Sequence, residues 1–251
     1  MANLKSLRKK LRYFLRIDPT TATEAQAKKF FLKEKKNNST IAGAIRHRLK
    51  NAKTVFDVGA NSGFFSREIL EGGYTGTVVL FEPIPNLLSI ATKTIAQFNV
   101  QKIFVNAALG EESGEANIYL PHNRNLGWVT LVNEKRQTNN AIPIKLEDAR
   151  NFIRIFKPDF VKIDVEGYEL FVLRPFLDFI DQTYRPEFLV ELGWGKSNPN
   201  WPDFMSVAAE LVARGYRFLN ARDTTAELSL SDLAALNRTV DVLITPTTER
   251  I

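Results

Sequence analysis

Short apolar runs alternate with amphipathic stretches from about residue 53 onward. Apolar runs predict strands at 54–58, 77–81, 102–106, 160–164 and 188–192. The stretches at 64–71, 85–98 and 168–179 have the spacing of helices. Because the strands are apolar throughout, they are expected to be covered on both faces. The pattern predicts an α/β domain with a mostly parallel sheet and helices on both faces.

The C-terminal third continues this pattern with a helix near 203–214 and a last pair of strands at 216–219 and 240–245. These bring the predicted sheet to seven strands. The stretch at 110–151 does not fit the alternation. It contains one expected strand at 116–120 and a polar segment at 121–140, which we interpret as a long loop on the substrate side.

The first 50 residues have a different character. Apolar residues at positions 4, 7, 11, 14 and 15 have helical spacing, and basic residues fill the opposite face. Further helices are expected at 21–35 and 41–49. We therefore predict a basic helical extension over residues 1–50 and a main domain over residues 51–251.

Charge is distributed unevenly between these two parts. Residues 1–50 hold 14 of the 34 Lys and Arg residues and 3 of the 28 Asp and Glu residues, so they carry +11. The remainder holds 20 basic and 25 acidic residues and carries −5. An acidic body is not typical of a protein that wraps nucleic acid. The basic helix at 4–16 can lie on an anionic membrane surface, but packing against the protein's own core is the more common use of such a helix.

Composition excludes several classes of protein. The chain has no cysteine, which excludes disulfides, a thiolate nucleophile and thiolate-bound metals. No stretch has the roughly 20 consecutive apolar residues of a membrane span, and no secretory signal is evident. We expect a cytoplasmic protein, with peripheral membrane contact through residues 4–16 as the alternative. The oligomeric state stays open.

A glycine-containing turn follows the first predicted strand, at residues 57–63. Gly59 and Gly63 allow a sharp turn and a close approach of the backbone to a ligand. Asn61 stands where a dinucleotide-binding loop needs its second glycine, and the Asp57 carboxylate would repel a phosphate. S-adenosylmethionine has no phosphate and carries a positive amino group, which Asp57 can bind directly or through water.

An acidic residue follows the second predicted strand. Glu82 lies 19 residues after Gly63, close to the roughly 20 residues expected between a glycine turn and a ribose-binding acid. Its carboxylate can accept hydrogen bonds from both ribose hydroxyls. Asn106 and Ala107 follow the third strand, and this topology predicts that they border the adenine. The alternative for the turn is a tight strand-to-helix connection that needs glycine for its geometry alone.

Carboxylates gather after the fourth and fifth predicted strands. Asp164 and Glu166 follow the fourth strand and Glu191 ends the fifth, so the three are expected at one edge of the sheet. One of them could accept the proton of an acceptor hydroxyl. His122 is a second candidate for this base, although a lone histidine in a loop is more often solvated. Helix capping and binding of a divalent cation are alternatives for the acids, and we expect no metal.

The chain resembles the FkbM-type methyltransferases over about residues 53–192. The resemblance rests on VFDVGANSG at 55–63, FEPIP at 81–85, NAALG at 106–110 and, most specifically, VKIDVEGYE at 161–169. It implies a class I methyltransferase fold, which is Rossmann-like, and transfer of a methyl group from S-adenosylmethionine to a hydroxyl oxygen. The acceptors it implies are sugars of glycans or glycolipids and small secondary metabolites.

Two other functions remain open from the sequence. An RNA methyltransferase could use the basic N-terminus, but the residues at 164–167 differ from the Asn/Asp-Pro-Pro-aromatic motif of the adenine- and cytosine-modifying types. A non-catalytic cofactor-binding module would be expected to lose the cofactor acids, whereas Asp57, Glu82 and Asp164 are all present.

Overall fold

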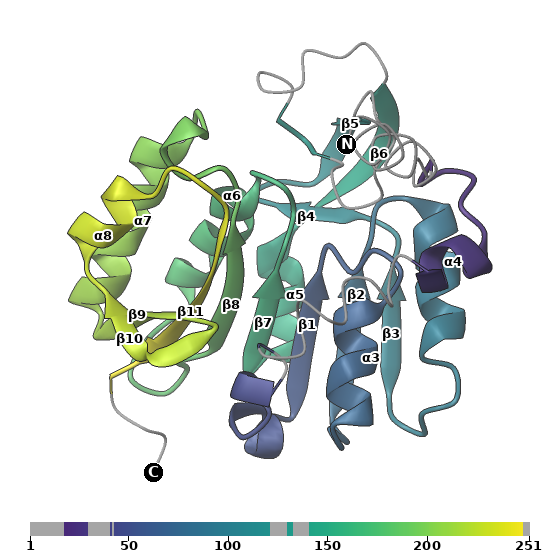
Figure 1. Ribbon diagram of the computed structural model, residues 1–251, viewed down its shortest axis with the longest axis horizontal. Helices are drawn as coiled ribbons and strands as arrows, with labels where there is room; N and C mark the ends of the chain where they lie inside the picture. Colours follow the sequence, from purple (N-terminus) through teal and green to yellow (C-terminus); the bar gives the residue numbers. More distant parts are fainter. Residues whose placement is uncertain (1–17, 30–40, 42, 121–129, 133–140, 248–251) are drawn as a thin grey trace, which may run out of the picture.

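The computed structural model describes residues 18–29, 41, 43–120, 130–132 and 141–247. The main sheet has eight strands in the order β10-β9-β11-β8-β7-β1-β2-β3 (Figure 1). The strands are β1 (Thr54–Val58), β2 (Thr77–Phe81), β3 (Lys102–Val105), β7 (Phe160–Ile163), β8 (Glu187–Leu192), β9 (Tyr216–Asn220), β10 (Asp223–Leu228) and β11 (Val240–Pro246). From β8 to β3 neighbouring strands are parallel, whereas β11 is antiparallel to β8 and β9, and β10 to β9.

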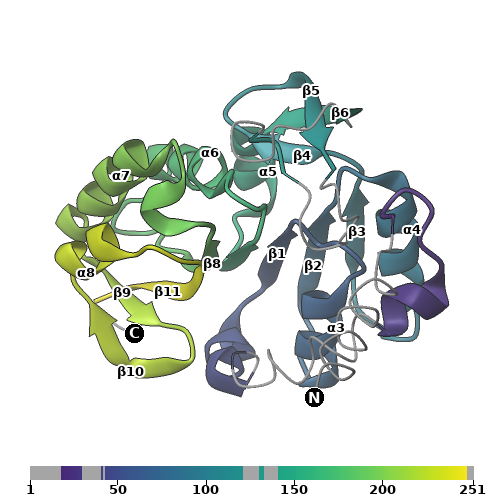
Figure 2. The ribbon, with the colours of Figure 1, turned by 45° about the horizontal axis from the view of Figure 1, so that its top comes forward.

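Helices cover the sheet on both sides (Figure 2). The first side carries α3 (Phe64–Glu71) and α4 (Pro85–Thr94), and the second carries α5 (Ala149–Phe156), α6 (Glu169–Leu173) and α7 (Trp201–Ala213). Helix α8 (Leu230–Ala235) and the short 3-10 helices η1 (Arg48–Asn51), η2 (Arg174–Asp178) and η3 (Gly195–Ser197) lie in the connections.

Successive side chains of a strand point to opposite faces of the main sheet, so each strand contributes residues to the apolar core on either face. On β1, Phe56 and Val58 belong to the core beneath α5, α6 and α7, while Val55 belongs to the core beneath α3 and α4. All three side chains are buried, as uniformly apolar strands in a covered sheet should be. Edge-to-face contact between Phe56 and Phe81, with ring centroids 5.1 Å apart, joins β1 to β2 in the first of these cores.

A second, smaller sheet lies beyond the carboxyl ends of β1, β2 and β3 (Figure 1). It consists of β4 (Ala108–Gly110), β6 (Ala141–Asp148) and β5 (Gly114–Tyr119) in that spatial order. Its apolar core contains Ala108, Ile118, Ile144 and Leu146. This sheet therefore stands next to the edge at which parallel sheets bind ligands.

The prediction of seven strands is wrong, because β10 adds an eighth. This strand lies at the edge of the sheet, and its residues alternate between exposed and partly buried. It therefore has no apolar run to mark it. The stretch at 110–151 was also under-predicted, since it contains β6 and the start of α5 as well as the expected strand near 116–120. The strands at 54–58 and 77–81 and the helix at 64–71 are confirmed at their predicted bounds.

Part of the N-terminal segment packs beside α4. Residues 24–29 are helical, which agrees with part of the helix predicted at 21–35. Ala22 and Ala27 share a small core with Ile84 and Leu87. The Asn86 side chain donates hydrogen bonds to the carbonyl oxygens of Pro19 and Ala22.

Other N-terminal predictions have different outcomes. The helix predicted at 4–15 lies outside the described residues. Residues 41 and 43–45 are helical, and a turn and η1 follow them where the prediction had one continuous helix to 49. The division into an extension and a main domain stays a prediction. Among the described residues, no helix is long and apolar enough to cross a membrane.

Candidate active site

The turn after β1 is built from three residues with left-handed backbone. Gly59, Asn61 and Gly63 have φ angles of 74°, 50° and 78°. A Cβ atom on Gly59 would lie 2.0 Å from the carbonyl oxygen of Asp164, so no other residue fits there without moving β7. The amide nitrogens of Gly59 and Ala60 both donate to the carbonyl oxygen of Phe81. The turn is thus held against both neighbouring strands.

Glu82 joins this turn to the beginning of α4. Its Oε2 accepts a hydrogen bond from the amide nitrogen of Asn61 at 2.8 Å, and its Oε1 accepts one from Ile84 at 2.9 Å. Burial raises the pKa of Glu82 to about 7, although the two backbone donors and Lys162 act in the opposite direction. Each carboxylate oxygen can accept more than one hydrogen bond, so Glu82 keeps acceptor capacity for a ligand.

Asp57 is fully buried beneath the turn. Its Oδ2 accepts hydrogen bonds from the Ser66 hydroxyl at 2.6 Å and the Ser66 amide nitrogen at 3.3 Å, which fixes the first turns of α3. Within the described residues its Oδ1 accepts no hydrogen bond, but it lies 3.4 Å from the Lys162 ammonium. Asp57 is not among the residues that line the cleft described below.

Lys162 is the buried cation of the site. Its Nζ donates to the carbonyl oxygen of Gly59 at 2.9 Å and lies 3.4 Å from Asp57 and 3.3 Å from Asp164. Asp57 and Lys162 are register partners on β1 and β7, which explains their proximity. Burial lowers the pKa of Lys162, but the carboxylates of Asp164 and Asp57 outweigh burial and raise it above the ordinary value.

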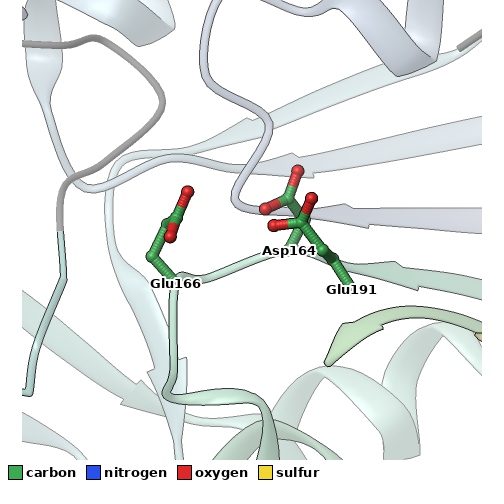
Figure 3. Close-up of side chains that lie close together, drawn as sticks. All are labelled: Asp164, Glu166 and Glu191. Carbon is green, nitrogen blue, oxygen red and sulfur yellow. The ribbon is translucent and has the colours of Figure 1, made fainter. Parts of the chain in front are cut away.

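Asp164, Glu166 and Glu191 come together as predicted. Ile163 pairs with Val190 in the parallel register of β7 and β8, so the next residues along, Asp164 and Glu191, are neighbours at the carboxyl ends. Figure 3 shows the carboxylates of Asp164 and Glu191 side by side, with Glu166 extending beside them. One oxygen of each lies within 4.8 Å of the others, close enough for the three to share a divalent cation.

This crowding changes the proton affinity of Glu191. The negative charge of Asp164, followed by burial and the charge of Glu166, raises the pKa of Glu191 well above the usual range for a glutamate. Like charges this close cannot all ionise without a compensating cation. The raised pKa favours the protonated form of Glu191, and a positive ligand beside the cluster would lower that pKa.

An open cleft runs from the turn after β1 to this cluster. Its lining residues come from the turns after β1, β2 and β7 and from the small sheet: Val58, Gly59, Asn61, Phe81, Glu82, Pro83, Ile84, Leu87, Ala108, Leu109, Ile118, Leu131, Asp164, Val165 and Glu166. The charged members of this described lining are all acidic. Such a cleft suits a cofactor with a sulfonium and an amino group better than a pyrophosphate, whose negative charges these acids would repel.

The other predicted residues do not line the cleft, and Glu191, which lies beside Asp164, is one of them. Asn106 donates hydrogen bonds to the carbonyl oxygens of Glu82 and Pro83, so it supports the loop that carries the ribose candidate. Ala107 is buried, and the next residue, Ala108, lines the cleft instead. Gly63 packs against Ala91 of α4. The contacts that we predicted for these residues and for Asp57 with the cofactor stay predictions.

Sequence reasoning missed two polar residues at the site, and one prediction lies outside the described part. Lys162 lies two residues before Asp164, and side chains two residues apart on a strand point to the same face of the sheet. That spacing could have suggested an ion pair between them. Thr130 donates a hydrogen bond to the backbone of Glu166, and nothing in its sequence context indicates this contact. His122, the second candidate for the base, is not among the described residues.

Comparisons with known proteins identify the family and the fold. A model of the methyltransferase FkbM domain matches residues 57–218. The plantazolicin methyltransferase BpumL in complex with SAH is similar in fold, with a TM-score of 0.50 and 9% identity over 98% of this chain and 99% of that one. An O-methyltransferase from Bacillus cereus in complex with SAH matches with a TM-score of 0.43 and 12% identity over 83% and 79% of the two chains. No curated protein matches the chain.

The fold and the cleft define an S-adenosylmethionine-dependent methyltransferase of class I, as predicted, and at these low identities the solved structures bear on the fold alone. Since the family model covers more than half of the chain, the protein belongs to the FkbM methyltransferase family.

Replacement of Lys162 by methionine should destabilise the protein. It would leave the fully buried Asp57 carboxylate without its cation, and such a loss typically costs about 3–5 kcal/mol. Urea denaturation would measure the change. The double variant K162M/D57N should recover part of the loss, and Lys145→Met, at an exposed lysine, should change little. A K162M variant as stable as K145M would contradict the structural role of Lys162.

The raised pKa of the buried Glu169 predicts that the stability of the protein depends on pH. Its Oε1 accepts a hydrogen bond from the amide nitrogen of Gly167, and burial raises its pKa to about 7. A glutamate that binds its proton more tightly when folded makes the protein less stable as pH rises from about 4.5 to 7. Glu169→Gln removes the titrating carboxyl and with it this dependence on pH. Its free energy of unfolding relative to wild type should therefore rise by up to about 3 kcal/mol between pH 5 and pH 8. A difference that does not change with pH would show that Glu169 titrates normally.

Proposed function

We propose that this protein transfers a methyl group from S-adenosylmethionine to a hydroxyl oxygen of a sugar, glycan, glycolipid or small metabolite. The observation that carries the proposal is the cluster of Asp164, Glu166 and Glu191, of which Asp164 and Glu166 line the same cleft as Glu82. An acidic cleft of this kind has a partner for a cationic methyl donor and a proton acceptor for an alcohol in the same space.

The cofactor end would be formed by Glu82 and the turn after β1. Backbone donors from Asn61 and Ile84 fix both Glu82 oxygens, so the carboxylate is preorganised for a ribose diol. The apolar side chains of Ile84, Leu87 and Leu109 also line the cleft and would flank an aromatic base. When bound, S-adenosylmethionine supplies an electrophilic methyl group on a positively charged sulfur.

The reaction end would be formed by the carboxylate cluster. The acceptor oxygen bonds to the methyl carbon as the carbon–sulfur bond breaks, and the hydroxyl proton must leave. A positive charge beside the cluster lowers the pKa of Glu191, so Glu191 releases its own proton to solvent, and the resulting carboxylate then takes the proton of the acceptor hydroxyl. Asp164, held by Lys162, keeps the local charge that makes Glu191 a strong base.

A panel of acceptors tests the reaction. The wild-type protein would be incubated with methyl-labelled S-adenosylmethionine and methyl glycosides of glucose, mannose, galactose and rhamnose, with catechol and a folded RNA as alternatives. Label is expected in a sugar or small hydroxyl compound as an acid-stable methyl ether. Transfer to RNA alone would contradict the proposed acceptor class.

Glu191→Gln should then lower kcat by about 100-fold or more, because proton removal is lost, and leave cofactor affinity within about twofold. The control Glu227→Gln changes an exposed carboxylate on β10 and should behave as wild type. Dialysis against EDTA should leave the rate unchanged. A loss of activity that Mg²⁺ restores would instead assign the cluster to a cation.

Glu82→Gln tests the cofactor end. The amide keeps the shape of the side chain but loses the charge and one acceptor oxygen, so binding of S-adenosylhomocysteine should weaken by about tenfold or more. Calorimetry measures this directly, with Glu115→Gln, an exposed residue of β5, as the control. Equal affinities for the E82Q variant and the wild-type protein would overturn the assignment of Glu82 to the ribose.

A further inference from the structure

Glu166 occupies an unusual backbone conformation. Its φ angle is +53°, and that of the following Gly167 is +100°. A left-handed residue with a side chain costs roughly 1–2 kcal/mol, so its surroundings must hold it there. This turn determines the direction in which the Glu166 carboxylate leaves the backbone toward the cluster (Figure 3).

Three side chains hold the turn. The Thr130 hydroxyl donates to the carbonyl oxygen of Glu166 at 2.6 Å, and the Asn198 side chain donates to that of Gly167 at 2.9 Å. Glu169 accepts a hydrogen bond from the amide nitrogen of Gly167 at 2.8 Å. Glu169 belongs to the same local segment and Asn198 to the connection after β8, whereas Thr130 comes from the wall of the cleft next to the small sheet.

Thr130 is itself fixed in place. Its side chain is fully buried, and its backbone forms a two-way bridge with Tyr119 at the end of β5. Its hydroxyl oxygen accepts a hydrogen bond from the amide nitrogen of Val132 at 3.0 Å. Because that oxygen is already oriented by Val132, its proton points toward the carbonyl oxygen of Glu166.

The residue after Thr130 reaches the ligand space. Leu131 lines the cleft together with Ile118 of β5 and Glu166 itself. The Thr130 hydroxyl therefore connects the apolar wall of the cleft directly to the turn that presents Glu166.

We propose that Thr130 is a positioning residue for methyl transfer: its hydroxyl sets the backbone from which Glu166 faces the acceptor and couples the Ile118–Leu131 wall to the carboxylate cluster. This inference rests on the proposed function, in which Glu166 belongs to the acceptor end of the cleft. Thr130 acts through Glu166 and does not touch the reacting atoms.

The test compares Thr130→Val, which keeps the volume of the side chain and removes its hydroxyl, with Thr130→Ser, which keeps the hydroxyl. The substrate is the methyl glycoside or small hydroxyl compound that the wild type methylates best in the panel above. T130V should lower kcat by about tenfold or more, because misplacement of a group near the reacting atoms is costly. Affinity for S-adenosylhomocysteine should stay within about twofold, and T130S should restore most of kcat.

A matched control separates positioning from general loss of a buried hydroxyl. Thr245 is also a buried threonine, but it lies at the opposite end of the sheet, where its hydroxyl accepts a hydrogen bond from Arg48. Thr245→Val should leave kcat unchanged. If T245V lowers kcat as much as T130V, or if T130S does not rescue, the positioning role is overturned.

A double-mutant cycle tests whether Thr130 acts through Glu166. In the Glu166→Gln background, T130V should have little further effect on kcat, because the group that it positions is already inactive. Independent, multiplicative losses in kcat would contradict the coupling.

Amide hydrogen exchange distinguishes failure of this inference from failure of the proposed function. If the wild type methylates no compound of the panel, the proposed function fails, yet the turn can still be examined. Exchange at residues 164–168 should be faster in T130V than in wild type and T130S. Unchanged exchange in T130V would overturn the positioning claim by itself, whatever the panel shows.

Discussion

Contact between the turns after β1 and β7 is the constraint on which the rest of the site depends. Gly59 approaches the carbonyl oxygen of Asp164 so closely that a Cβ atom would overlap it, and the Lys162 ammonium binds across the same junction to Gly59, Asp57 and Asp164. One turn carries Gly59 and Asn61 of the proposed cofactor site, and the other carries Asp164 and Glu166 of the carboxylate cluster. Their fixed separation would set the distance between a bound methyl donor and these carboxylates, which catalysis by alignment requires.

Negative charge accumulates around this junction, and the structure compensates only part of it. Lys162 offsets the charges of Asp57 and Asp164 in part, whereas Glu82 and Glu191 are left with raised pKa values. Carboxylates whose pKa is raised by burial and by neighbouring negative charge lower the stability of the folded protein. They also favour binding of a cationic ligand, because the cation relieves the repulsion between them. Acidic character thus suits the cationic cofactor and would also supply the base of the proposed reaction.

The sequence predicted most fully those parts that depend on local pattern. The bounds of β1, α3 and β2 agree because apolar runs and helical spacing are decided within a few residues, and the cluster followed from the rule that parallel strands end at one edge. Edge strand β10 was not predicted, because it has no run of apolar residues that would mark it as part of the core. Thr130 was missed because its contact with Glu166 joins positions 36 residues apart through tertiary structure. Asp57 was expected at the ligand, and its burial against Ser66 depends on packing that no spacing reveals.

A crystal structure with S-adenosylhomocysteine bound tests the central claim most directly. The account predicts ribose hydroxyls within hydrogen-bond distance of Glu82, the adenine between the apolar residues of the cleft, and the sulfur facing the cluster of Asp164, Glu166 and Glu191. A ribose bound away from Glu82, or a sulfur turned from the cluster, would contradict the arrangement of donor and base proposed for this methyltransferase.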